Sequence, residues 1–104
     1  MRRTRLILVA LSALAVSFGS AQTALSIATG GTGGVYYPVG GGYAQIIDQF
    51  VEGYTATVEA TNASVDNVAF ISRGDSDIAL ALADTVMAAY LGTGNFGPGG
   101  NLPQ

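Results

Sequence analysis

The sequence predicts an α/β protein in which three parallel strands alternate with three helices, in the order β-α-β-α-β-α. Short apolar runs of strand length alternate along the chain with longer segments of helical periodicity. A glycine (Gly53, Gly74 or Gly92) closes each helical segment, as is typical of helix C-termini. A strand, a helix and a second strand in succession imply a right-handed crossover between parallel strands, and this favours the α/β class.

The first strand is predicted at residues 25–29 and runs into a glycine-rich turn before a helix. Glycine lets the main chain approach a bound group closely and adopt positive φ, and proline suits the first position of a helix. A strand, a tight turn and a helix N-terminus together form an anion site; the alternative is a tight connection that binds nothing. The segment reads Gly30-Gly31-Thr32-Gly33-Gly34-Val35-Tyr36-Tyr37-Pro38.

The first helix is predicted to begin at Pro38 and to stop at Gly53. Three consecutive glycines at 40–42 weaken its first turns by about 1 kcal/mol each relative to alanine. They indicate close backbone packing or close approach of a ligand. Apolar residues at helical spacing predict the buried face of this helix, and they are Val39, Tyr43, Ile46, Ile47 and Phe50.

The second strand, at residues 54–60, alternates between larger apolar and polar positions, as a half-exposed edge strand does. The helix after it is predicted to run from Ser64 or Val65 to Arg73. Ser64 is a favourable N-cap, Asp66 suits the first turn, and Arg73 complements the helix C-terminus.

The third strand is predicted at residues 77–82, which are apolar after the first residue, as in a strand buried on both faces of a parallel sheet. The helix after it is expected to be capped by Asp84 or Thr85. Residues 93–104 are rich in glycine, proline and asparagine and show no periodicity. The apolar stripe of this third helix is Val86, Met87, Tyr90 and Leu91.

Placing the half-exposed second strand at the sheet edge predicts the strand order 2-1-3. In this order, strand two lies on one side of strand one and strand three lies on the other side, so the two crossover connections run in opposite directions. A crevice therefore opens between the C-terminal ends of strands one and three. The turn at residues 30–38 and the loop at residues 83–85 flank this crevice.

The first 21 residues have the three regions of a secretory signal peptide. Three arginines lie within the first five residues, an apolar run follows at residues 6–18, and Gly19-Ser20-Ala21 supplies small residues. We expect cleavage after Ala21. The alternative is a transmembrane anchor, but a membrane span needs about 20 apolar residues and the run at residues 6–18 is shorter than that.

Composition excludes several classes of partner and chemistry. Without residues 1–21 the chain has one cation, Arg73, against seven acidic residues, a net charge of −6. We therefore expect no nucleic-acid partner and no insertion into the membrane after signal cleavage. The chain has no cysteine and no histidine, so disulfides, thiolate metal sites and the commonest general base are missing. We expect no metal, no cofactor and no enzymatic activity.

Four sequence blocks, in order behind the signal sequence, resemble the TAXI-type solute receptors of TRAP (tripartite ATP-independent periplasmic) transporters. The resemblance implies a two-lobed, type II periplasmic-binding-protein fold. It also implies a periplasmic receptor that captures a small organic acid, such as glutamate or a dicarboxylate, and delivers it to TRAP membrane permease subunits. The blocks are residues 25–40, Thr61-Asn62-Ala63-Ser64-Val65-Asp66-Asn67, Gly74-Asp75-Ser76-Asp77-Ile78-Ala79-Leu80 and Tyr90-x-Gly92-Thr93-Gly94.

Members of this family are several times longer and include a second lobe. The resemblance therefore implies that the chain is a truncated N-terminal fragment. Residues 22–92 would form the N-terminal part of lobe 1, and residues 93–104 a tail. We expect such a fragment to fold marginally and to bind a ligand weakly, because one incomplete lobe buries little apolar surface.

The predicted ligand-binding residues lie in three loops at the C-terminal edge of the sheet. Backbone N–H groups of the glycine turn would hold a carboxylate, with a threonine hydroxyl beside them and two tyrosines that either form a wall or simply pack. Helix capping is an equally good or better explanation for the serine and threonine of the other two loops. The full set is Gly31, Thr32, Gly33, Gly34, Tyr36, Tyr37, Asn62, Ser64 and Thr85.

Two other function classes fit the sequence less well. Half of a nucleotide-binding enzyme would need the third glycine of G-x-G-x-x-G or a G-K-[ST] motif, and both are missing after Gly31-Thr32-Gly33. A secreted structural module that binds nothing would not explain the glycine turn.

Overall fold

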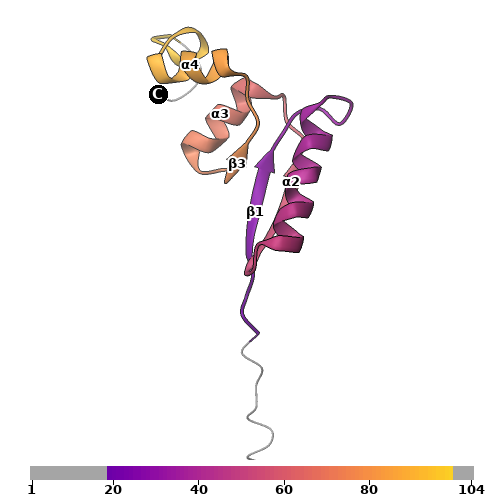
Figure 1. Ribbon diagram of the computed structural model, residues 1–104. Helices are drawn as coiled ribbons and strands as arrows, with labels where there is room; N and C mark the ends of the chain where they lie inside the picture. The colour runs from indigo at the N-terminus through magenta and orange to yellow at the C-terminus, as the bar shows by residue number, and fades with distance from the viewer. Residues whose placement is uncertain (1–18, 100–104) are drawn as a thin grey trace, which may run out of the picture.

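The computed structural model describes residues 19–99 (Figure 1). The predicted signal peptide therefore lies almost entirely outside the described residues. Between residues 19 and 99, no helix has the length and apolar character needed to cross a membrane. The elements are β1 (Thr23–Ala28), α2 (Tyr36–Phe50), β2 (Tyr54–Glu59), α3 (Ser64–Arg73), β3 (Ile78–Ala79), α4 (Ala83–Leu91) and the 3₁₀ turn η1 (Gly94–Phe96).

The three strands form one parallel sheet in the order β2-β1-β3, which confirms the predicted class and strand order. β1 pairs with β2 along its whole length, from Thr23 opposite Tyr54 to Ala28 opposite Glu59. It pairs with β3 only at Ile27 and Ala28. Figure 1 shows α2 and α3 on opposite sides of β1, as two right-handed crossovers in opposite directions require.

Small residues bring α2 close to the sheet. The buried cluster consists of Ile27, Ala44 and Ala56, with Leu25, Ile47 and Val58 packed around it. Gly40 is also buried, and a Cβ atom built on it would collide with Cγ2 of Thr29. Close backbone packing, one of the two predicted reasons for the glycine run, is confirmed at this position, while Gly41 and Gly42 face open space.

The predicted buried face of α2 is wrong at four of its five positions. Only Ile47 packs against the core. The other four side chains are 43–76% exposed, because the helix turns its glycine and alanine face to the sheet and they lie on its other sides. These four are Val39, Tyr43, Ile46 and Phe50.

β2 is an edge strand, as its alternation predicts, and one side chain of α2 bonds to its backbone. The Asp48 carboxylate accepts a hydrogen bond from the backbone N–H of Ala56 at 2.8 Å. An edge strand otherwise leaves such groups open to pairing with another chain. A side chain of the preceding helix thus satisfies one of them.

The prediction that the third strand is buried on both faces is wrong. β3 has two residues, Ile78 is 36% exposed, and Leu82 is 57% exposed after the strand has ended. No strand among the described residues covers the outer side of β3, so its apolar run remains accessible. The Asp77 carboxylate accepts a hydrogen bond from the Ser26 N–H at 2.8 Å and so extends the contact between β1 and the β3 segment.

The C-terminal ends of α3 and α4 follow the glycine signals, whereas α2 ends at Phe50 with an extended Val51 at its C-cap, before the predicted stop at Gly53. The predicted side-chain caps are absent. Gly74 and Gly92 close α3 and α4 in the left-handed conformation, with φ of 76° and 63°. The N-cap positions are Ala63 and Leu82, and neither helix has a side-chain cap hydrogen bond. Capping by Ser64, Asp84 or Thr85 is therefore wrong.

α4 buries none of its residues, so its predicted apolar stripe is also exposed. The segment after α4 shows no periodicity in its sequence, yet it forms η1 and buries Phe96. Arg73 lies in the last turn of α3, as predicted, and pairs with Asp75 at 2.8 Å.

Candidate functional site

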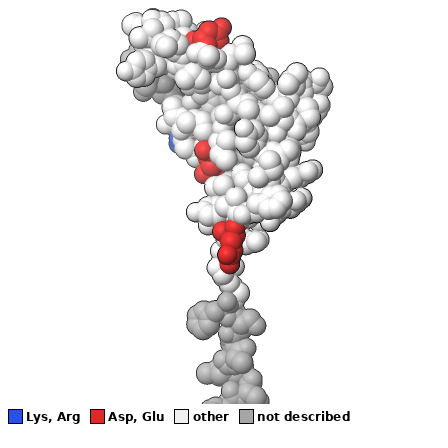
Figure 2. Space-filling model, in the orientation of Figure 1, with Lys and Arg blue, Asp and Glu red and all other residues white. Residues whose placement is uncertain are grey.

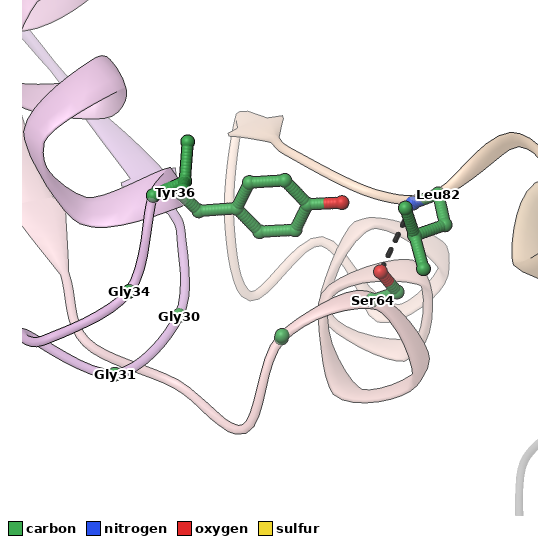
Figure 3. A pocket seen from close by; sticks show the side chains of 8 residues that line it. Gly30, Gly31, Gly34, Tyr36, Ser64 and Leu82 are labelled. Atoms are coloured by element: carbon green, nitrogen blue, oxygen red, sulfur yellow. Dashed lines mark hydrogen bonds between the residues drawn. The ribbon is translucent and has the colours of Figure 1, made fainter.

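A hollow of about 320 Å³ opens at the C-terminal edge of the sheet, where three loops meet (Figure 3). The first loop follows β1, the second precedes α3, and the third precedes α4. This is the edge at which ligands bind in open parallel sheets. The lining residues are Gly30, Gly31, Gly34, Val35, Tyr36, Ala63, Ser64 and Leu82.

The glycine turn is compact because its backbone approaches its neighbours closely. The Gly34 N–H donates to the Gly31 carbonyl at 2.9 Å, and the Thr61 N–H donates to the Gly30 carbonyl at 3.3 Å. A Cβ atom on Gly30 would lie 3.5 Å from the Ala63 Cβ and 3.6 Å from the Tyr36 Cβ. None of the glycines from 30 to 34 has positive φ, so close approach is the glycine property that this turn uses.

The N-terminus of α2 contributes both backbone donors and a wall. The helix begins at Tyr36, so Pro38 occupies its third position rather than its first. The first N–H groups of a helix have no partner within the helix, and a proline there loses no hydrogen bond. Figure 3 shows the half-buried ring of Tyr36 extending toward Ser64 and Leu82.

Ser64 connects two of the loops. Its hydroxyl oxygen accepts a hydrogen bond from the Leu82 N–H at 2.9 Å (Figure 3). A serine hydroxyl that accepts one hydrogen bond still has its own proton to donate. The side chain can therefore hold the loop before α4 and offer a donor to a ligand at the same time.

The electrostatic character of the hollow comes from the backbone. Helices α2, α3 and α4 all begin at or next to its lining, and each helix N-terminus carries a partial positive charge. Among the described residues, no acidic or basic side chain lines it. Figure 2 shows acidic side chains in separate groups on an otherwise largely uncharged surface, and Arg73 is the only cation of residues 19–99. The arrangement can hold a small anion through backbone N–H groups.

The structure brings together four of the nine predicted site residues, namely Gly31, Gly34, Tyr36 and Ser64. Thr32, Gly33 and Tyr37 belong to the same segment but do not line the hollow. The remaining two are engaged elsewhere.

Asn62 donates from Nδ2 to the Asp66 carboxylate at 2.8 Å. Thr85 donates its hydroxyl to the Asp84 carboxylate at 3.2 Å and lines a second, smaller hollow of about 220 Å³ between α3, α4 and η1.

Four lining residues were not predicted from the sequence: Gly30, Val35, Ala63 and Leu82. Each lies at the start of the glycine turn or directly before a helix. The sequence signal that could have identified them is their position next to a helix start, because their side chains carry no distinctive chemistry.

Comparison with known families places most of the chain in one of them. Residues 27–103 match the NMT1-like family. The matched segment starts inside β1 and includes every later element and all eight residues that line the hollow.

Proposed function

This chain belongs to the NMT1-like family, a family of the periplasmic-binding type, and we propose that it captures a small organic acid for transport. The family favours a solute-binding role over an enzymatic one. A hollow of about 320 Å³ lies in the range of small-molecule sites, about 300–1,000 Å³.

The observation that carries the proposal is the convergence of three helix N-termini on a hollow without acidic side chains. A carboxylate placed there meets partial positive charge from α2, α3 and α4. It also meets a possible donor in the Ser64 hydroxyl. The apolar parts of the lining, Tyr36 and Leu82 among them, would contact the carbon skeleton of the acid.

The proposal extends to the kind of transporter. The sequence blocks around the glycine turn and at residues 61–67 support a TAXI-type receptor of a TRAP transporter, with glutamate or a dicarboxylate as ligand and membrane permease subunits as partners. Residues 22–92 would then form part of lobe 1. Thr32, Gly33, Tyr37, Asn62 and Thr85 would contact only a ligand that extends beyond the hollow.

Nuclear magnetic resonance tests the binding role on the 104-residue chain, because it detects binding of weak affinity and assigns it to individual residues. The ¹⁵N-labelled protein is titrated with succinate and glutamate up to millimolar concentrations. We expect the amide signals of Gly31, Gly34, Tyr36 and Ser64 to move with both acids. Succinamide, which has the same skeleton without charge, is the matched control, and AMP tests the nucleotide alternative. No movement with either acid, or equal movement with succinamide, would contradict the proposal.

Export is tested separately by N-terminal sequencing of the protein recovered from the periplasm of an expressing cell. We expect the first residue to be Gln22. Recovery only in the cytoplasm with residues 1–21 retained would contradict periplasmic location.

A further inference from the structure

We propose that Asn67 is a positioning residue that sets the spacing of the three loops around the hollow, an inference that rests on the proposed binding role. Asn67 does not line the hollow. It lies in the first turns of α3, is 0% exposed, and its side-chain amide bonds to a residue in or directly before each of the three loops.

The amide nitrogen holds the two strands that flank the crevice. Nδ2 donates to the Thr29 carbonyl at 2.6 Å and to the Leu80 carbonyl at 2.7 Å. Thr29 directly precedes Gly30, and Leu80 lies two residues before Leu82. One NH₂ group therefore fixes the position of the residue after β1 relative to the residue after β3.

The amide oxygen holds the third loop. Oδ1 accepts a hydrogen bond from the Thr61 hydroxyl at 2.6 Å. The same hydroxyl oxygen accepts from the Ala63 N–H at 3.0 Å, one residue before Ser64. The loop between β2 and α3 is thus connected through Thr61 to the amide that joins the other two.

Asparagine suits this position because its amide has two donor hydrogens and one acceptor oxygen in a plane. An aspartate would place a carboxylate against two carbonyl oxygens. A leucine would leave the Leu80 carbonyl without its side-chain donor and would remove one hydrogen bond each from the Thr29 carbonyl and the Thr61 hydroxyl, which stay bonded to each other. The described residues contain no buried side-chain polar atom without a partner, so the existing arrangement is fully satisfied.

The test compares variants of the full chain by amide hydrogen exchange without ligand. The reporters are the N–H groups of Thr61, Leu80 and Leu82, which donate to Gly30, Ala28 and Ser64 and so report on all three loops. In Asn67→Asp we expect all three to exchange roughly tenfold faster relative to the core amide of Ala44, the size expected when one hydrogen bond is lost. Ala69→Gly, at another buried position of α3, is the matched control and should not change the three reporters selectively.

A second pair of variants keeps the inference testable if Asn67→Asp does not fold. Thr61→Val removes the hydroxyl that joins Asn67 Oδ1 to the third loop, whereas Thr61→Ser retains it. We expect faster exchange at Leu82 and Thr61 in the valine variant and recovery of the original rates in the serine variant. Equal rates in the two Thr61 variants, or in Asn67→Asp and Ala69→Gly, would overturn the positioning role.

Succinate titration of the same variants separates this inference from the proposed function. We expect about tenfold weaker binding for Thr61→Val than for Thr61→Ser, matching the loss of one hydrogen bond. Failure of the unsubstituted chain to bind succinate would refute the proposed function, while the exchange rates of the free protein would still decide the role of Asn67.

Discussion

The layer between α2 and the sheet and the loop edge around the hollow are held together by different forces. The layer is apolar and depends on small residues, since Gly40 and Ala44 let the helix approach Ile27 and Ala56. The loop edge depends on side-chain hydrogen bonds centred on Asn67. A substitution in the layer should therefore change the free energy of unfolding, and one at the loop edge should change loop geometry and binding.

The largest loss of stability is expected from Ile27→Ala. Ile27 is 0% exposed and belongs to the buried cluster of the layer. Removing a buried isoleucine side chain costs about 2–5 kcal/mol through lost transfer energy and the cavity left behind. Urea denaturation followed by circular dichroism measures this loss. An unchanged midpoint would show that the layer does not determine the stability of the chain.

Two glycines of the same helix are expected to respond in opposite directions. Gly40→Ala places a methyl group against Thr29 and should destabilise the protein by about 1–3 kcal/mol through overpacking. Gly42→Ala meets nothing within 4 Å and should stabilise it by about 1 kcal/mol through helix propensity. Both values come from denaturation curves, and equal effects of the two substitutions would contradict the close contact at Gly40.

The smallest effect is expected on the outer face of α2. Tyr43 is 54% exposed, so Tyr43→Gln should change the free energy of unfolding by no more than about 0.5 kcal/mol. A loss comparable with that of Ile27→Ala in the same assay would mean that the face predicted from the sequence is the buried one after all.

The element order, the strand order and the C-terminal ends of α3 and α4 could be predicted because they follow from local patterns in the sequence. Gly74 and Gly92 end helices in the left-handed conformation, a property of the residue itself. The alternation in β2 reflects its position at the edge.

Features that depend on distant contacts could not be predicted in the same way. The sequence of α2 offers two faces, and the one with large apolar residues is not the one that packs, because Gly40 and Ala44 permit a closer approach. Ser64 satisfies the N–H of Leu82, 18 residues away, instead of capping its own helix. Asn67 contacts residues that are 38 and 13 positions away in the sequence. Only the resemblance of residues 61–67 to the TAXI-type receptors therefore drew attention to its segment.

The most direct test of the account compares succinate titrations of three proteins: the unsubstituted chain, Gly30→Val and Gly33→Val. Gly30 lines the hollow, and its side-chain position lies between Ala63 and Tyr36, whereas Gly33 does not line it and has no atom within 4 Å. We predict that succinate moves the amide signals of Gly31, Gly34 and Ser64 in the unsubstituted chain and in Gly33→Val, and that this response is lost in Gly30→Val. Retained binding in Gly30→Val together with lost binding in Gly33→Val would contradict a carboxylate site in this hollow.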